Sequence, residues 1–225
     1  MDLFTEYGRN LLPYDGEVNY YGRVVRDADA YFDRLMGEVP WEHDRVFVAG
    51  QMRSTRRKVA WFGDGGFLYA YSGVTRRAIP WIEPLVQIRG MVEERLGDRG
   101  DRGDRGDGGN GGVGGNRGEG KGVGGTAFNS CLANLYADGT EGMSWHSDDE
   151  AVLGVDTVIA SLSLGAERRF LLRHKRTKET VQVILEHGSL LVMKGATQTH
   201  WLHSVPAAAR VMKPRINLTF RTFVG

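Results

Sequence analysis

Disulfides, long apolar runs and a dominant charge are all missing from this 225-residue sequence. Its single cysteine, Cys131, cannot form an internal disulfide and lies in an apolar run, so we expect a buried, inert thiol. The first 20 residues carry charges and a proline and lack the apolar run of a secretory signal. No run reaches the roughly 18 apolar residues that a membrane span needs. We therefore expect a soluble, intracellular monomer with no membrane partner, cytoplasmic in a bacterium, with the nucleus as an alternative in a eukaryote.

Glycine, in contrast, is concentrated in one segment. Residues 97–125 hold 15 of the 32 glycines and no aromatic side chain. Glycine at this density cannot repay the entropy cost of ordering, so we expect 97–125 to be a disordered loop. A helix before this segment and a strand after it would join directly if the segment were deleted. We therefore expect a single domain over residues 1–225 with 97–125 as an insert.

Helical patterns precede the insert and strand patterns follow it. Residues 27–41 predict an amphipathic helix that begins near Asp27 or Asp29, and residues 80–97 predict a second helix that ends at Gly97. Between them, two stretches are typical of strands broken by glycine turns. These stretches are residues 44–52 and 58–73, and further strand-like runs follow the insert at 128–139, 157–175, 180–195, 199–206 and 214–224. This order predicts an α+β fold with a strand-rich core.

The stretch "WHSDDE", residues 145–150, contains a spacing that can hold a metal ion. On an extended segment, residues i and i+2 face the same way, so His146 and Asp148 can both point inward. Two imidazoles and one carboxylate form the facial triad of non-haem Fe(II) oxygenases. The pair is a weak signal alone, because it needs a third ligand. Four histidines are candidates for that ligand: His174, His187, His200 and His203.

The C-terminal stretch "RINLTFR", residues 215–221, alternates between apolar and polar side chains. One face carries Ile216, Leu218 and Phe220, and the other carries Arg215, Asn217, Thr219 and Arg221. Burying the polar face without a ligand would be costly. Two guanidinium groups on one face suit a dicarboxylate such as 2-oxoglutarate, which each can bind with two parallel hydrogen bonds. The alternative is an exposed edge strand with ordinary surface arginines.

Four stretches in order resemble one family. They are "RKVAWFGDGGFLYAYSG", "NLYADG" with the "WHSDDE" that follows it, "HGSLLVMKGATQTHWLHSVP" and "PRINLTFR". Together they resemble the AlkB family of Fe(II)/2-oxoglutarate dioxygenases, most closely the members that repair alkylated DNA. The resemblance runs from about residue 45 to the C-terminus and is interrupted only by the insert. It implies a double-stranded β-helix (jelly roll) core with an N-terminal helical and strand extension for nucleotide recognition.

The resemblance also implies roles for individual residues. His146, Asp148 and His203 would be the catalytic iron ligands, with His200 in a supporting role. The co-substrate 2-oxoglutarate would be held by Asn134, Tyr136, Arg215, Thr219 and Arg221, with Asn217 on the same strand face. The implied cofactor is Fe(II), and the implied co-substrates are 2-oxoglutarate and O₂.

An enzyme of this kind must extrude its target base into a pocket. The resemblance assigns Tyr69, Tyr71 and Ser72 to the lid over that pocket, and Tyr71 and the His146 ring could sandwich the base. Asp149 and Glu150 would favour a cationic methylated ring over the neutral base. Duplex-specific relatives carry an apolar wedge in the turn that here contains Ala49, Gly50 and Gln51. Because alanine is small for a wedge, the preference between single- and double-stranded DNA stays open.

Contacts to DNA phosphates must come from local basic clusters, because the formal net charge is only +1. Two clusters qualify, at residues 53–58 and 168–178. Within them we predict backbone contacts from Arg57, Lys58, Arg168, Arg173 and Lys175. Each cluster could instead be a solvated face.

The predicted function is therefore oxidative demethylation of 1-methyladenine and 3-methylcytosine in DNA. It would consume 2-oxoglutarate and O₂ and release formaldehyde, succinate and CO₂. An RNA demethylase of the same family is the alternative enzyme. A non-catalytic nucleic-acid binding module would not need the histidines, the aspartate and the two arginines together, and a zinc hydrolase would not need the arginine strand.

Overall fold

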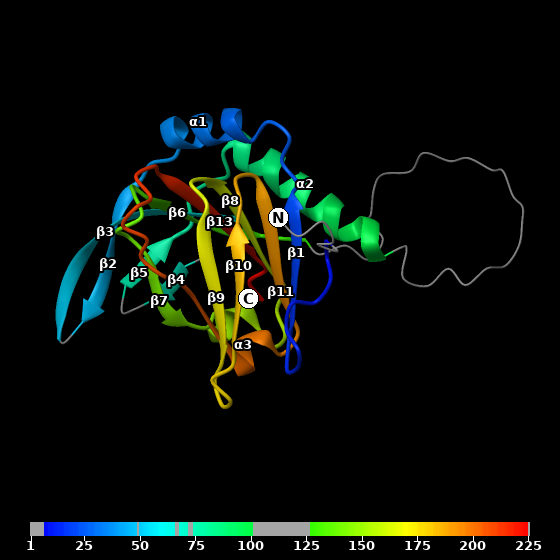
Figure 1. The fold of residues 1–225 in the computed structure, drawn as a ribbon. Coiled ribbons are helices and arrows are strands. Elements are labelled where there is room, and N and C mark those ends of the chain that lie inside the picture. The colour runs from blue at the N-terminus through cyan, green and yellow to red at the C-terminus, as the bar shows by residue number, and fades with distance from the viewer. Residues whose placement is uncertain (1–6, 49, 66–67, 72–73, 101–126, 225) are drawn as a thin grey trace, which may run out of the picture.

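The computed structural model describes residues 7–48, 50–65, 68–71, 74–100 and 127–224. Its framework is a seven-stranded antiparallel sheet that faces a four-stranded antiparallel sheet (Figure 1). The larger sheet has the order β1 (Glu17–Arg23), β11 (Ser189–Lys194), β8 (Ile159–Gly165), β13 (Arg215–Arg221), β6 (Ser130–Tyr136), β3 (Gln51–Gly63) and β2 (Glu42–Val48). The smaller sheet has the order β10 (Thr180–Leu185), β9 (Arg168–His174), β12 (Trp201–Val205) and β7 (Met143–His146). A separate hairpin pairs β4 (Leu68–Tyr71) with β5 (Val74–Arg77).

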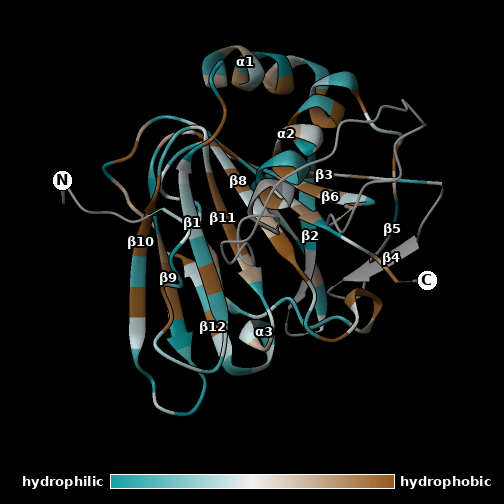
Figure 2. Cartoon of the chain, turned by 90° about the vertical axis from the view of Figure 1, so that its right-hand side faces the viewer, coloured by the Kyte–Doolittle hydropathy of each residue, from teal (hydrophilic) through white to brown (hydrophobic). Residues whose placement is uncertain are grey.

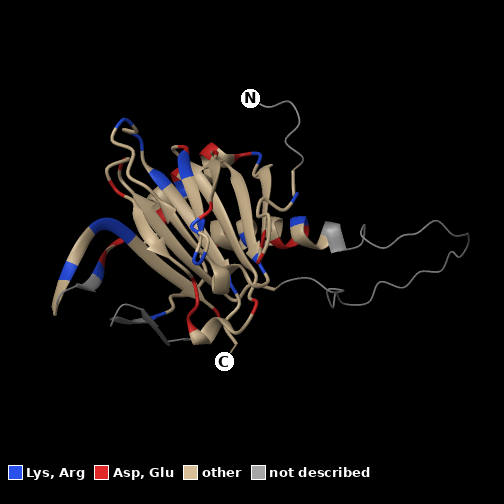
Figure 3. Cartoon of the chain, turned by 60° about the horizontal axis from the view of Figure 1, so that its bottom comes forward, with Lys and Arg blue, Asp and Glu red and all other residues tan. Residues whose placement is uncertain are grey.

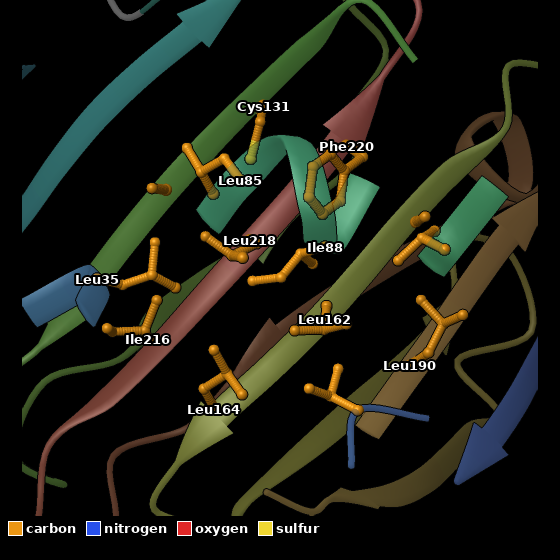
Figure 4. Packing of buried hydrophobic residues seen from close by; sticks show 14 of the residues in the cluster. Leu35, Leu85, Ile88, Cys131, Leu162, Leu164, Leu190, Ile216, Leu218 and Phe220 are labelled. Atoms are coloured by element: carbon orange, nitrogen blue, oxygen red, sulfur yellow. The ribbon is translucent and has the colours of Figure 1, made fainter. Parts of the chain in front are cut away.

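Two long helices cover the outer face of the larger sheet (Figure 1). They are α1 (Ala28–Glu38) and α2 (Glu83–Gly100), while a 3-10 turn η1 (Ala151–Leu153) and a short helix α3 (Thr197–His200) lie in connections. Leu35 of α1 and Leu85 and Ile88 of α2 pack fully buried against apolar side chains of the central strands (Figure 4). None of the described helices is long and apolar enough to cross a membrane.

Strand alternation divides the interior into two layers. The face of β13 with Ile216, Leu218 and Phe220 packs under the helices, as the sequence pattern predicts. The opposite face of the larger sheet meets the smaller sheet around a second apolar cluster that includes Leu172, Leu191 and Trp201. Figure 2 shows the same alternation as polar and apolar bands along β10. The polar residues of β13 therefore point between the two sheets, where a site can form.

The sandwich of mostly antiparallel sheets with few helices is consistent with the predicted jelly-roll core, while the predicted N-terminal extension for nucleotide recognition stays a prediction. The N-terminal strands β1, β2 and β3 join the larger sheet. Cys131 is fully buried in the first cluster, and burial raises the pKa of its thiol well above the usual range. This agrees with the expected inert cysteine.

One of the two expected helix boundaries agrees with the structure and the other does not. Helix α1 begins after Asp27 as expected, but the Asp27 side chain makes no capping hydrogen bond. Helix α2 continues to Gly100, so the predicted end at Gly97 is wrong. A glycine inside a helix costs only about 1 kcal/mol relative to alanine, which does not by itself end a helix. The rest of the predicted loop, residues 101–125, lies outside the described residues, and its predicted disorder stays a prediction.

Candidate metal centre

Three of the predicted ligands converge between the sheets. His146 ends β7 and pairs directly with His203 of β12, while Asp148 lies two residues beyond β7. Their ligand atoms all lie within 4.8 Å of one another. The Asp148 Oδ1 atom is 3.7 Å from His146 Nε2 and 3.9 Å from His203 Nε2. Two imidazole nitrogens and one carboxylate oxygen therefore face a common point, which is the donor set of an Fe(II) facial triad.

The protonation states also suit metal binding. The Nδ1 atom of His146 lies 2.8 Å from the carbonyl oxygen of Ser144, which only accepts, so Nδ1 carries the proton and Nε2 keeps its lone pair. Burial lowers the pKa of His203 to about 3, although Asp148 opposes the shift, so its imidazole is neutral at pH 7. Burial alone would raise the pKa of Asp148, but Arg221 and the two histidines outweigh it and hold this pKa at about 2.

A second group of candidate ligands, formed by Asp15, His174 and His200, is a different kind of feature. The backbone N–H of Thr177 donates to His174 Nδ1 at 3.1 Å. Because Nδ1 accepts, the proton of the ring lies on Nε2, which is 3.3 Å from Asp15 Oδ2. A protonated nitrogen has no lone pair for a metal, so we assign this group to a polar contact between His174 and Asp15 at the end of β9. His200 belongs to it rather than to the first group.

His187 is also remote from the first group. Its Nδ1 accepts from the backbone N–H of Gly165 at 2.7 Å, and its Nε2 lies 3.2 Å from Asp29. Of the four histidines that the sequence left open as a third ligand, the structure thus brings only His203 to the His146 and Asp148 pair.

A cavity between the sheets extends from the three ligands along β13, β6 and β8. Its wall includes all three ligands together with Asn134, Tyr136, Ser161, Asn217, Thr219 and Arg221. Every member of the expected 2-oxoglutarate set except Arg215 lines it. Arg215 lies directly behind the wall, with its guanidinium carbon 5.3 Å from the centre of the Tyr136 ring. The cavity thus includes the metal ligands and Tyr136, and the buried Arg215 lies next to the Tyr136 ring.

The two arginines of β13 have separate surroundings. Arg221 Nη2 donates to Asp148 Oδ2 at 2.5 Å, so it holds a metal ligand. Arg215 is 1 % exposed and donates from Nη2 to Ser163 Oγ at 2.9 Å. Its Nε and Nη1 atoms are buried without a hydrogen-bond partner, as is Oδ1 of Asn134. Burial lowers the pKa of Arg215 to about 10, so it is still a cation at pH 7. Unused buried donors on a cation are what a carboxylate would satisfy.

The expectation that both arginines point to one dicarboxylate is therefore modified, because Arg221 already engages Asp148. Two serines of β8 were missed. Ser163 accepts from Arg215, and Ser161 Oγ accepts from Asn217 Nδ2 at 2.9 Å. Polar residues two apart in the apolar run "IASLSLG" were the available signal, since they share the inward face.

Two predicted DNA contacts are corrected by the structure. Arg57 is 8 % exposed, forms an ion pair with buried Asp44 and donates to Met143 Sδ at 3.3 Å. Arg168 is 2 % exposed and donates to the carbonyl oxygens of Glu141 at 2.7 Å and Pro206 at 2.8 Å. Neither guanidinium can reach a phosphate. In each cluster the strand pleat turns one arginine inward while its neighbour, Arg56 or Arg169, is exposed.

The other predicted backbone contacts are more accessible. Lys58 and Arg173 are half-buried, and the Arg173 guanidinium lies 4.1 Å from the centre of the Trp145 ring, next to the ligand His146. Lys175 Nζ donates to the carbonyl oxygen of Gln198 at 2.9 Å. Figure 3 shows further basic positions on the projecting β2–β3 hairpin, where Arg53 and Arg56 are exposed.

The predicted base-recognition residues are described only in part. Ala49 and Ser72 lie outside the described residues. Tyr69 and Tyr71 belong to β4, opposite Arg76 and Val74 of β5. Gly50, at φ +78°, and the exposed Gln51 begin the return of the β2–β3 hairpin. Beside the metal ligands, Asp149 is exposed and accepts from Ser147 Oγ at 3.0 Å, while Glu150 is half-buried.

Comparisons with known proteins agree with this geometry. A model of the 2OG-Fe(II) oxygenase superfamily matches residues 23–221. The chain is 38% identical over 206 residues to the Mus musculus protein named DNA oxidative demethylase ALKBH2, covering 87% of this chain and 74% of that one. It is 35% identical over 208 residues to the Bos taurus alpha-ketoglutarate-dependent dioxygenase alkB homolog 3, covering 88% and 62%. The solved structure of OsALKBH1 has the same fold, with a TM-score of 0.58, 16% identity and coverage of 94% and 99%.

Proposed function

Because the chain belongs to the 2OG-Fe(II) oxygenase superfamily, we propose that it is a DNA oxidative demethylase. It removes methyl groups from ring nitrogens of alkylated bases such as 1-methyladenine and 3-methylcytosine. One atom of O₂ enters the methyl group, which leaves as formaldehyde, and the other enters 2-oxoglutarate, which becomes succinate and CO₂. The observation that carries the proposal is the meeting of His146, Asp148 and His203 in the wall of a cavity that also includes Tyr136, with the buried Arg215 packed against the Tyr136 ring.

His146, Asp148 and His203 would hold Fe(II), which supplies the activation of O₂ when bound. The chain supplies the ligand states. Ser144 fixes the proton of His146 on Nδ1, burial keeps His203 neutral, and Arg221 keeps Asp148 ionised. His203 and Asp148 are therefore in the states that bind a metal at pH 7, and the His146 tautomer leaves the Nε2 lone pair free for it.

Arg215 would bind the carboxylate of 2-oxoglutarate that is distant from the metal. Its unused Nε and Nη1 donors support this role, and Tyr136 and Asn134 line the same end of the cavity. Asn217 and Thr219 line the path between that end and the ligands.

For the DNA we propose three groups of contacts. Tyr69, Tyr71 and Ser72, with the turn at Ala49, Gly50 and Gln51, would surround the extruded base. Asp149 and Glu150 would favour the cationic methylated ring, because both follow Asp148 directly. Lys58, Arg173 and Lys175 would contact phosphates, whereas Arg57 and Arg168 are withdrawn from that role because both are buried.

The test is an activity panel with one purified protein. Single- and double-stranded DNA and matched RNA, each with one 1-methyladenine or 3-methylcytosine, are incubated with Fe(II), 2-oxoglutarate and ascorbate. We expect equal amounts of formaldehyde and demethylated DNA, and no product with Asp148→Ala. Succinate formed without any demethylation, or faster turnover of RNA than of both DNA forms, would contradict the proposal. We also propose a monomer, cytoplasmic in a bacterium or nuclear in a eukaryote, which gel filtration and cell imaging test.

A further inference from the structure

The metal ligand Asp148 needs support for its main chain. It lies beyond the end of β7, so no strand ladder binds its backbone N–H. This N–H instead donates to the side-chain oxygen Oε1 of Gln198 at 2.9 Å, and both residues are buried. A buried N–H left without a partner is costly. Gln198 therefore takes the place of a neighbouring strand for this one residue.

The orientation of the Gln198 amide is fixed from both ends. Only its oxygen can accept from the Asp148 N–H. Its Nε2 donates to Met193 Sδ at 3.4 Å, and a thioether sulfur can only accept. The side chain is 7 % exposed, so water offers little competition. A flipped amide would place two donors together at Asp148.

Helix α3, which carries Gln198, is tied to both sheets. Next to Gln198, Thr197 Oγ1 bonds to the carbonyl oxygen of Lys194 at 2.6 Å and accepts from the backbone N–H of Glu17 at 2.9 Å. Lys175, just after β9, donates to the carbonyl oxygen of Gln198 itself. The Gln198 side chain, which accepts from the Asp148 N–H, is thus carried by a helix that is bonded to both sheets.

We propose that Gln198 is a positioning residue for the metal centre. Arg221 holds Asp148 Oδ2 from one side, and Gln198 holds the Asp148 backbone from the other. Between these two contacts, Oδ1 stays within 4 Å of both histidine nitrogens. Without Gln198 the loop is free to follow Arg221, and Oδ1 leaves the metal position. The inference rests on the proposed function only in taking Asp148 as a metal ligand.

The experiment compares Gln198→Leu, which keeps the size and removes the acceptor, with Gln198→Glu, which keeps an oxygen acceptor. The control is Thr199→Ala, an exposed neighbour on α3. Co(II) titration followed by visible absorption gives metal affinity and coordination without turnover. Loss of an outer contact to a ligand typically weakens metal binding about 10- to 100-fold, which we expect for Gln198→Leu. Gln198→Glu should lie closer to the wild type, and DNA affinity by fluorescence anisotropy should not change in any variant.

Turnover provides a second readout. At limiting Fe(II), Gln198→Leu should be slow, and excess Fe(II) should restore part of kcat with little change in the KM for 2-oxoglutarate. Equal Co(II) affinity for Gln198→Leu and Thr199→Ala would overturn the inference. So would equal losses in the Leu and Glu variants, since the acceptor would then be irrelevant. A wild-type protein that binds no Co(II) and demethylates nothing would instead refute the proposed function.

Discussion

Replacement of Arg215 tests the co-substrate end of the cavity. The side chain is 1 % exposed, has one hydrogen bond to Ser163 and two buried donors without a partner. A bound carboxylate would use those two donors. Hydrogen bonds to charged groups contribute about 1.5–3 kcal/mol each, and about 1.4 kcal/mol corresponds to a factor of ten in affinity. If Arg215→Ala removes one such hydrogen bond, the affinity for 2-oxoglutarate should fall at least about tenfold. If it removes two, the affinity should fall more than about a hundredfold.

The assay is calorimetric titration of 2-oxoglutarate into Mn(II)-loaded protein without O₂, supported by the KM for 2-oxoglutarate in formaldehyde release. Arg215→Lys should lie between alanine and wild type, because lysine keeps the charge and loses the planar fork. The matched control is Arg173→Ala, which should weaken DNA and leave 2-oxoglutarate unchanged. The reasoning is refuted if Arg215→Ala keeps wild-type affinity for 2-oxoglutarate, or if it lowers DNA affinity instead.

Four further predictions follow from the described contacts. His146→Ala, Asp148→Ala and His203→Ala should each abolish Co(II) binding and demethylation, whereas His200→Ala should keep most of both. If His200 proved essential for metal binding and His203 did not, the ligand assignment would be wrong. Burial lowers the pKa of His203 from 6.5 to about 3, so metal-free protein should lose stability as the pH falls from about 6.5 towards 3, by at most about 1.4 kcal/mol per pH unit from this group. When the free energy of unfolding is measured with urea at several pH values, it should fall less steeply with decreasing pH in His203→Leu than in the wild type. Cys131 should not react with a thiol reagent until the protein is unfolded, since its burial raises its pKa; rapid labelling of native protein would contradict this. Arg57→Ala and Arg168→Ala should lower the melting temperature, while Arg173→Ala should reduce DNA affinity and its salt dependence without a change in melting temperature.

Strand alternation was the most informative signal in the sequence. The two faces of residues 215–221 were assigned correctly, because a pleated strand has only two sides and Ile216, Leu218 and Phe220 require the apolar one. The same rule, applied to the basic clusters, would have turned Arg57 and Arg168 inward. Clustered charge is typical of a protein surface, which favours the exposed assignment for both arginines until the strand positions are considered. For β13 and for both basic clusters, the alternation of side chains along the strand determines which residues are buried.

Other features depended on strand pairing that a single sequence does not contain. The choice among four histidines required the register that places His203 opposite His146. The family resemblance selected His203, whereas spacing alone could not. The contact of Gln198 with Asp148 joins residues 50 positions apart, and nothing local distinguishes Gln198 from an ordinary helix residue. Helix α2 continues past Gly97 because the low helix propensity of glycine is an average over many proteins, whereas tertiary packing determines where an individual helix ends.

The surroundings of Tyr136 have a consequence for the protein at rest. Arg57, Arg168 and Arg215 are buried near it, and the acids Asp44, Asp138 and Glu141 act on the first two of these arginines. The Arg215 guanidinium forms no ion pair with an acid of the described residues, and a buried charge without a counter-ion raises the free energy of the native state. A dicarboxylate that neutralises it binds the folded chain and not the unfolded one, so it shifts the folding equilibrium by mass action. Succinate, which keeps both carboxylates, should share this effect. The melting temperature of the protein would then report the concentrations of 2-oxoglutarate and succinate around it, and the enzyme would be protected from unfolding by its own reaction product.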